Sequence, residues 1–283
     1  MKNLHVRTFT GAAAGPRFLT LGAIHGNEKC GTEAISRLIT ELDAGIVTLT
    51  AGTLTCVPVC NPEAYAQDLR YVEQNLNRII TPHQKPSCVE HHRANEVIAL
   101  INDCDIMLDL HSYSAGVKPF LFLDKEDDAH RAYASVLGIP EWVAGWNDAY
   151  AAMGDLNSGD TVSYAHSQGK IATLVECGIH SDPAGGGVGY RALRAALAHF
   201  GLTDAYPLHS DMPMISRLTS IVTKDREGDF VRDWQHLDQV MEGEVVARYA
   251  DGEDIKAPHD GVVILPGRKA ALGSEWIYFG KHE

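Results

Sequence analysis

Apolar strand-like segments alternate with amphipathic helical segments through the first two hundred residues of this chain. Strands are expected at 18–21, 53–60, 106–111, 119–123, 142–146 and 171–177, and helices at 35–42, 90–102, 129–137 and 190–200. Pro58 indicates that the second strand lies at an edge or contains a bulge. The alternation predicts an α/β fold in which helices cover a mixed, mostly parallel sheet.

The pattern changes near residues 204–207. Beyond this point, short β-like runs are separated by turn signals such as Glu242-Gly243 and Asp260-Gly261, and no helix is expected. We therefore expect two domains, an α/β domain at 1–206 and a small all-β domain at 207–283. A glycine run at 185–189 does not match a phosphate-binding fingerprint, so it is interpreted as a flexible loop before the last helix.

Charge and composition exclude several classes of function. The net charge of −13 disfavours a nucleic-acid partner and an anionic membrane surface, because both require a basic footprint. No apolar run is long enough to span a membrane, and no secretory signal is recognisable at the N-terminus, so a cytoplasmic location is expected. The six cysteines show no Cys-x-x-Cys spacing and are expected to be reduced.

The segment His25-Gly26-Asn27-Glu28 lies between the first buried strand and the following helix. Open α/β sheets bind ligands at such strand-to-helix turns, and an imidazole with a carboxylate can bind one metal ion if the turn is tight. Glu28 is expected in the first helical turn, where the helix dipole favours its charge. Ordinary helix capping is the alternative interpretation of this pair.

Two further strands end in polar residues. His111 ends an apolar strand in which Asp109 shares its face, so Asp109 could support a metal ligand at His111. A hydrogen-bonded core histidine is the alternative. Glu176 ends an even more apolar strand, where an unpaired carboxylate is costly to bury. It is therefore either paired in a salt bridge or facing a cleft with a raised pKa, as a general base would be.

The polar loop at 61–80 contains two arginines and several asparagines. Arg70 and Arg78 suit recognition of a carboxylate, because the planar guanidinium group binds a carboxylate through two parallel hydrogen bonds. A solvated loop with surface ion pairs is the alternative interpretation.

These motifs occur in the order seen in a known family. They are His25-Gly26-Asn27-Glu28, Asn61-Pro62, Arg70-Tyr71, Asn75-Leu76-Asn77-Arg78, Asp109-Leu110-His111 and Val175-Glu176-Cys177-Gly178. The chain resembles the succinylglutamate desuccinylase/aspartoacylase family, a branch of the zinc carboxypeptidase-like hydrolases. The resemblance covers nearly the whole chain, including its β-rich C-terminal part.

The resemblance implies a role for each matching residue. It implies one Zn²⁺ per chain, bound by His25, Glu28 and His111. Glu176 would act as general base and acid, and Arg70 would polarise the scissile carbonyl. Asn77 and Arg78 would hold a substrate carboxylate, and the C-terminal domain would cap the cleft.

The sequence also departs from the family pattern. Asn75 stands where an Asp is more usual, and the segment 163–170 lacks the arginine that aspartoacylases carry there, which argues against N-acetylaspartate as the substrate. His166 lies near the missing arginine and is a candidate substrate contact. His180 would contact substrate or orient the catalytic carboxylate. Tyr278, in the last strand, would reach the cleft or pack as a strand aromatic.

The leading hypothesis is a zinc-dependent deacylase or amidohydrolase that acts on a small N-acylated amino acid or a related carboxylate. A metallocarboxypeptidase acting on a short peptide shares the mechanism and is the first alternative. A non-catalytic metal- or ligand-binding protein is the second, although binding zinc requires neither Glu176 nor Arg70. The oligomeric state stays open, with a homo-oligomer among the alternatives.

Overall fold

The computed structural model describes residues 3–114, 116, 118–154, 159–207 and 212–283. Its strands in the α/β part are β1 (Arg7–Thr10), β2 (Ala13–Gly22), β3 (Ala51–Val57), β4 (Ile106–Tyr113), β5 (Phe120–Leu123), β6 (Glu141–Ala144) and β7 (Ile171–Ile179). The helices are α1 (Cys30–Asp43), α2 (Pro62–Ala66), the 3-10 helix η1 (Leu76–Arg78), α3 (Val89–Asp103), α4 (Asp128–Val136), α5 (Trp146–Ala152), α6 (Thr161–Ser167) and α7 (Gly185–His199).

One sheet of eleven strands runs through the described part of the molecule in the order β1-β3-β2-β4-β7-β5-β6-β8-β14-β13-β10. Its central strands β3, β2, β4 and β7 are parallel, whereas β5 is antiparallel to β7. The predicted mixed, mostly parallel sheet is confirmed. The strand that contains Cys56 is not at an edge, because β1 pairs with it, and Pro58 lies just beyond its last residue.

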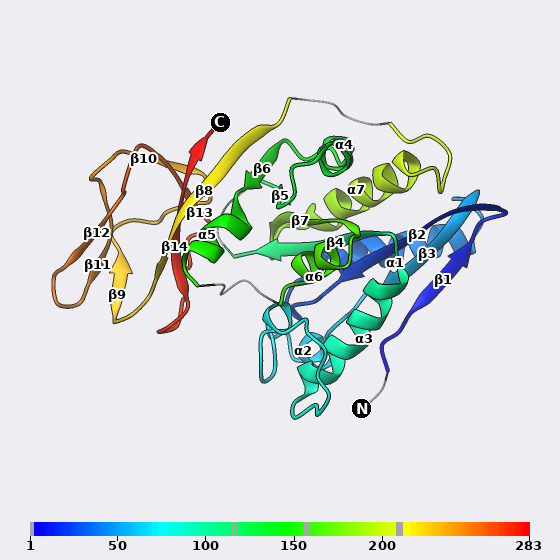
Figure 1. The fold of residues 1–283 in the computed structure, drawn as a ribbon, viewed down its shortest axis with the longest axis horizontal. Coiled ribbons are helices and arrows are strands. Elements are labelled where there is room, and N and C mark those ends of the chain that lie inside the picture. Colours follow the sequence, from blue (N-terminus) through cyan, green and yellow to red (C-terminus); the bar gives the residue numbers. More distant parts are fainter. Residues whose placement is uncertain (1–2, 115, 117, 155–158, 208–211) are drawn as a thin grey trace.

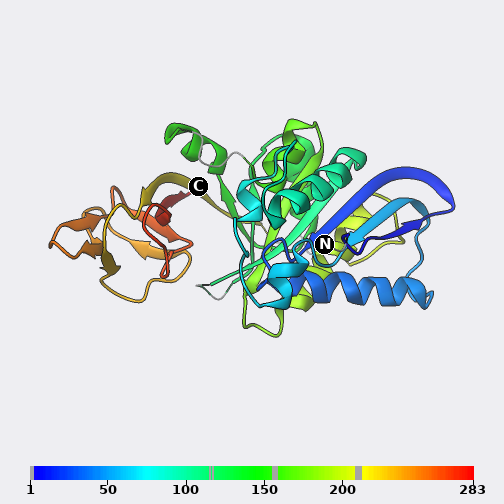
Figure 2. The same ribbon diagram turned by 90° about the horizontal axis from the view of Figure 1, so that it is seen from below.

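Helices cover both faces of this sheet. Helices α1, α4 and α7 pack on one face, and α3, α5 and α6 pack on the other, each over its own hydrophobic cluster. Figures 1 and 2 show this layering, with α1 and α3 on opposite sides of the strands. None of the helices in the described ranges is both long and apolar enough to cross a membrane.

The C-terminal part consists of strands that are mainly antiparallel. They are β8 (Met214–Thr223), β9 (Gly228–Phe230), β10 (Asp238–Val240), β11 (Val245–Tyr249), β12 (Asp254–Lys256), β13 (Gly261–Ile264) and β14 (Glu275–His282). Strand β8 pairs in parallel with β6, so the main sheet continues into this region, and β9, β11 and β12 form a separate small sheet. Trp234, Trp276 and Phe279 belong to its own hydrophobic cluster. Figure 1 shows these strands at the opposite end of the molecule from β1.

The glycine run at 185–189 is helical, so the loop expected there is wrong. It forms the first turn of α7, which packs closely against α1. A Cβ atom on Gly186 would lie 2.4 Å from a carboxylate oxygen of Glu33. The glycines therefore allow two helices to approach, and this tertiary packing outweighs the low helix propensity of glycine. Trp146, expected in a strand, instead begins α5 after Gly145.

Candidate active site

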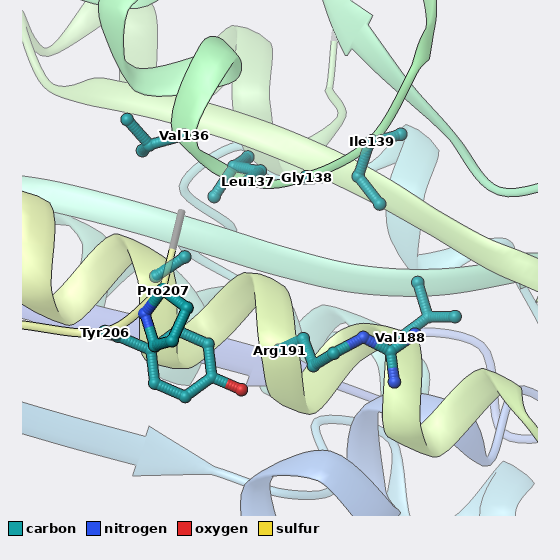
Figure 3. A pocket seen from close by; sticks show the side chains of 9 residues that line it. Val136, Leu137, Gly138, Ile139, Val188, Arg191, Tyr206 and Pro207 are labelled. Atoms are coloured by element: carbon teal, nitrogen blue, oxygen red, sulfur yellow. The ribbon is translucent and has the colours of Figure 1, made fainter. Parts of the chain in front are cut away.

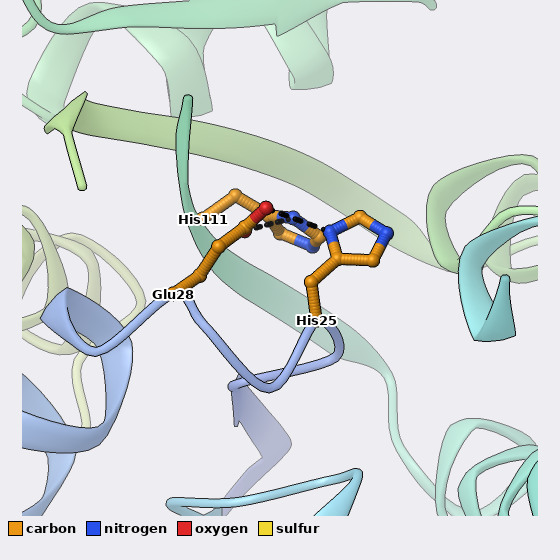
Figure 4. Close-up of side chains that lie close together, drawn as sticks. All are labelled: His25, Glu28 and His111. Carbon is orange, nitrogen blue, oxygen red and sulfur yellow. Dashed lines mark hydrogen bonds and ion pairs between the residues drawn. The ribbon is translucent and has the colours of Figure 1, made fainter. Parts of the chain in front are cut away.

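Three buried side chains meet at the carboxyl ends of β2 and β4. The Nδ1 atom of His25 lies 2.8 Å from one carboxylate oxygen of Glu28, and the Nδ1 atom of His111 lies 2.9 Å from the other. One possible ligand atom from each residue lies within 4.8 Å of the other two. All three residues are at most 2% exposed. Figure 4 shows both imidazoles directed at the carboxylate between them.

A tight turn brings His25 and Glu28 together. The backbone N–H of Glu28 donates to the carbonyl of His25 at 3.1 Å. Glu28 precedes the helix and does not lie in its first turn, because α1 begins at Cys30. Glycine is required at position 26, since a Cβ atom there would lie 2.2 Å from the carbonyl carbon of Ala64.

The charges of this cluster follow from its contacts. Burial and the nearby Arg70 lower the pKa of His25 to about 4. Burial opposes the charge of His111, but the carboxylates of Asp109 and Glu28 outweigh it and raise the pKa of His111 well above its usual value. Burial also opposes the charge of Glu28, yet the two histidines lower its pKa well below the ordinary range. The arrangement therefore favours an ionised carboxylate with imidazoles around it.

Polar side chains lie close to the Nε2 atom of each histidine. The Nε2 atom of His25 lies 3.0 Å from the side-chain oxygen of Asn75. The Nε2 atom of His111 lies 3.1 Å from Asp109 Oδ2, an ion-pair distance without hydrogen-bond alignment. Thr161 donates to the same Asp109 oxygen at 2.6 Å. Such contacts set the orientation of metal-binding histidines.

Glu176 lies beside this cluster on the next strand. It is the register partner of His111 between β4 and β7, and both side chains lie on the sheet face that α6 covers. Glu176 is 8% exposed, and its Oε2 atom has no hydrogen-bond partner among the described residues. Burial, followed by the negative charge of Glu28, raises the pKa of Glu176 to about 8. A carboxyl group in this state can take up and release a proton near neutral pH.

Arg70 reaches the cluster from the loop after α2. Its Nη1 atom donates to Glu28 Oε1 at 3.0 Å, and its backbone carbonyl accepts from the N–H of Gly26 at 3.1 Å. The Arg70 side chain is 44% exposed, so the guanidinium group lies at the boundary between the buried cluster and solvent. It can therefore meet both the cluster and a bound molecule.

Asn77 and Arg78 follow on η1. The side-chain oxygen of Asn77 accepts the backbone N–H of Thr161 at 3.0 Å, which ties the loop to α6. The Arg78 side chain donates to the carbonyl of Asn77 and lies 3.7 Å from a carboxylate oxygen of Glu275 on β14. The C-terminal strands thus contribute a carboxylate beside Arg78.

The remaining candidates are placed differently. Tyr278 is buried, with its hydroxyl 3.0 Å from that of Tyr150 and its ring stacked on Trp146. His180 Nδ1 lies 2.8 Å from the hydroxyl of Ser112, whose backbone N–H donates to Glu28 at 3.2 Å. Tyr278 is therefore connected to Arg78 by way of Tyr150 and Glu275. His180 does not contact the cluster directly but contacts Ser112, which contacts Glu28.

The structure does not bring His166 to the site. Its Nε2 atom contacts the carbonyl of Ala172 at 3.0 Å, and its ring packs edge-on against His130. Ala172 precedes Glu176 by four residues on β7, which is roughly 13 Å along a strand. His166 therefore lies toward the opposite end of the strand from the cluster.

No pattern in the sequence marks Thr161 or Ser112 as a support of this site, and Asn75 stands out only as a departure from the family motif. Each acts through a contact between residues far apart in the chain, such as Thr161 with Asp109, and no local motif marks such pairs. The one available signal was Asn75, because it lies in the same short motif as Asn77.

A small cavity lies elsewhere in the molecule. It measures about 90 Å³ and is lined by Val136, Leu137, Gly138, Ile139, Val188, Arg191, Ala195, Tyr206 and Pro207 (Figure 3). Helices α4 and α7 form it on the sheet face opposite the cluster. It contains none of the candidate site residues.

The donor set fits a metal ion. Two imidazoles and one carboxylate, all buried and converging, match the ligands of catalytic zinc sites, which leave a further position for water. The unpartnered carboxyl oxygen of Glu176 is the kind of group that a water molecule or substrate would satisfy.

The sequence of this chain matches a known protein family and several characterised proteins. The family model described as the succinylglutamate desuccinylase/aspartoacylase catalytic domain matches residues 14–184. The N-alpha-acetyl-L-2,4-diaminobutyric acid deacetylase of Halomonas elongata is 28% identical over 272 residues, which cover 88% of this chain and 77% of the relative. The succinylglutamate desuccinylase of Pseudomonas aeruginosa is 38% identical over 84 residues, only 29% of this chain and 25% of the relative.

A solved structure supports the fold over the whole length. The succinylglutamate desuccinylase/aspartoacylase from Rhodobacter sphaeroides has a TM-score of 0.76 at 21% identity, covering 99% of this chain and 89% of that one. The family model covers more than half of the chain and includes the cluster and Glu176. The chain therefore belongs to the succinylglutamate desuccinylase/aspartoacylase family, whose members are deacylases of N-acylated amino acids.

Proposed function

We propose that this chain is a zinc-dependent hydrolase that cleaves the amide bond of a small N-acylated amino acid or a related carboxylate. The observation that carries the proposal is the buried cluster of His25, Glu28 and His111 with the carboxyl group of Glu176 on the neighbouring strand. Metal binding alone would require the cluster but not a buried carboxyl group beside it. The names of the relatives support the same reaction class.

His25, Glu28 and His111 would hold one Zn²⁺. Zinc bound there would supply Lewis acidity, which activates water and polarises a carbonyl group. His25 is neutral at neutral pH because its pKa is about 4, and Glu28 is ionised, so both are in the state that a metal requires. His111 must release a proton before it can bind.

Glu176 would move the proton. It accepts a proton from the attacking water and returns it to the leaving amine as the amide bond breaks. Its buried position favours the protonated form near neutral pH, which helps the second of these transfers. Arg70 would donate hydrogen bonds to the carbonyl oxygen as negative charge develops there.

The substrate carboxylate would bind to Asn77 and Arg78, with His180 and Tyr278 at the margin of the pocket. Residues 1–206 would then form the catalytic domain, and residues 207–283 would cap the cleft. The contact of Glu275 with Arg78 supports this arrangement, because it brings the C-terminal part to the substrate side of the site. A capped cleft favours small substrates over extended peptides.

The test is a hydrolysis assay on a panel that contains N-acetyl-2,4-diaminobutyrate, N-succinylglutamate, N-acetylaspartate and a short peptide with a free C-terminus. We expect the zinc-loaded protein to release amine from at least one acylated amino acid. The Arg70→Ala variant should be at least about a hundredfold slower, as for loss of one oxyanion donor. A Glu41→Gln control, at the far end of α1, should hydrolyse normally. Hydrolysis of the peptide alone would instead make the chain a carboxypeptidase.

A further inference from the structure

A buried carboxylate outside the cluster of His25, Glu28 and His111 binds the loop that carries Arg70. Glu90, the second residue of α3, is 0% exposed. One of its oxygens accepts the backbone N–H of Val72 at 2.7 Å, and the other accepts those of Glu73 and Gln74 at 3.3 and 3.4 Å. The side-chain amide of Asn61 also donates to it, at 3.4 Å. Glu90 therefore binds three consecutive backbone amides of one loop.

That loop has little other support. Residues 66–74 are all exposed, and none of them belongs to a hydrophobic cluster. The loop is nevertheless tied to the cluster at both ends. Arg70 contacts Glu28, and the side-chain oxygen of Asn75 contacts His25 at 3.0 Å. The three amides bound by Glu90 lie between these two contacts.

The charge of Glu90 is suited to this task. Hydrogen bonds from backbone amides to a carboxylate are stronger than those to a neutral oxygen, and the start of a helix favours a negative charge. A glutamine has an NH₂ group in place of one carboxylate oxygen. This NH₂ group cannot accept hydrogen bonds from the backbone N–H groups of the loop. Substitution by glutamine should therefore release part of the loop while preserving the shape of the side chain.

Glu90 also belongs to a group with Glu73 and Cys88 whose possible ligand atoms lie within 4.8 Å of one another. This group does not resemble a second metal site. Backbone amides already point at Glu90, and the N–H of Val89 donates to Glu73 at 3.1 Å. Positive ends of N–H dipoles facing the carboxylates repel a cation.

We propose that Glu90 is a positioning residue that holds the loop at 70–75 so that Arg70 reaches the metal cluster. The part of this inference that concerns catalysis rests on the proposed function of Arg70. The part that concerns the loop stands on the contacts of Glu90 alone, so the two can be measured separately.

The first experiment is amide hydrogen exchange on the full-length protein, comparing wild type, Glu90→Gln and the control Glu96→Gln. Glu96 lies on the same helix but does not contact the loop. We expect exchange at residues 72–74 to become about tenfold faster or more in Glu90→Gln and to stay unchanged in the control. If Glu90→Gln fails to fold, Glu90→Asp, which keeps the charge on a shorter side chain, should show a smaller increase at the same amides. Unchanged exchange at 72–74 in the folded variant would overturn the proposal.

The second experiment is a kinetic cycle with Arg70→Ala, Glu90→Gln and the double variant. If Glu90 acts through Arg70, Glu90→Gln lowers kcat about tenfold or more, and the double variant is no slower than Arg70→Ala alone. Effects that multiply would overturn the positioning role. If the wild type hydrolyses no acylated amino acid, the proposed function fails, but the exchange measurement still decides whether Glu90 holds the loop.

Discussion

Replacing Glu176 by glutamine should strongly slow catalysis and stabilise the metal-free protein. The ordinary carboxyl pKa is 4.5, and burial with the Glu28 charge raises that of Glu176 to about 8. A raised carboxyl pKa means that the ionised form opposes folding. The penalty is absent below pH 4.5, grows from pH 4.5 to about 8, and is constant above that value. At pH 7 it amounts to ~3 kcal/mol, because each unit between 4.5 and 7 costs about 1.4 kcal/mol.

Glutamine removes this penalty without changing the side-chain volume. We expect urea unfolding of chelator-treated protein at pH 7 to show Glu176→Gln more stable than wild type by up to ~3 kcal/mol, with little difference at pH 4.5. The zinc-loaded variant should lose hydrolysis by a factor on the order of 10² to 10⁴. The reasoning is refuted if hydrolysis persists at the wild-type rate, or if the variant is less stable than wild type at pH 7.

Three further predictions concern the metal and the surrounding fold. Because Asp109 and Glu28 raise the pKa of His111, zinc binding near neutral pH should release about one proton; calorimetric heats that do not depend on buffer ionisation enthalpy would contradict this. Burial lowers the pKa of His236 to about 3, so the buried neutral imidazole contributes its full share of the folding stability above pH 6.5. This contribution is lost as the pH falls toward 3. When the pH is lowered from 7.5 to 4.5, the free energy of unfolding of metal-free His236→Asn in urea should therefore fall less than that of wild type, by up to ~3 kcal/mol. The same pH dependence in both proteins would argue against this. Gly26→Ala should lower zinc content, because its Cβ would meet the backbone of Ala64 at 2.2 Å, whereas Gly187→Ala, within α7, should bind zinc normally; equal zinc in both variants would oppose the argument.

The central sheet and the meeting of the site residues could be predicted from the sequence, because both follow local patterns. Apolar runs identified β4 and β7, and parallel strands place their carboxyl ends at one edge of a sheet. His111 and Glu176, each near the end of such a run, therefore become register partners. The turn between His25 and Glu28 is local as well, so its two side chains could be expected to meet.

Other features depend on contacts that no local pattern encodes. The glycines at 185–189 are helical because α1 lies against them, and strand β8 joins the main sheet through β6 although the sequence pattern changes before it. His166 is a candidate only through its position relative to a family motif, whereas α6 directs its side chain to the carbonyl of Ala172. Glu90 stands at the start of a predicted helix, and nothing near it in the sequence indicates that its carboxylate binds the backbone N–H of Val72.

The most direct test of the central claim is the zinc content of purified full-length protein, measured by elemental analysis for wild type and His111→Ala side by side after incubation with zinc and removal of the excess. The proposed site predicts about one zinc per chain in wild type and a large loss in the variant, because two ligands cannot hold the metal firmly. Absence of zinc from wild type, or equal zinc in both proteins, would contradict a metal site formed by His25, Glu28 and His111.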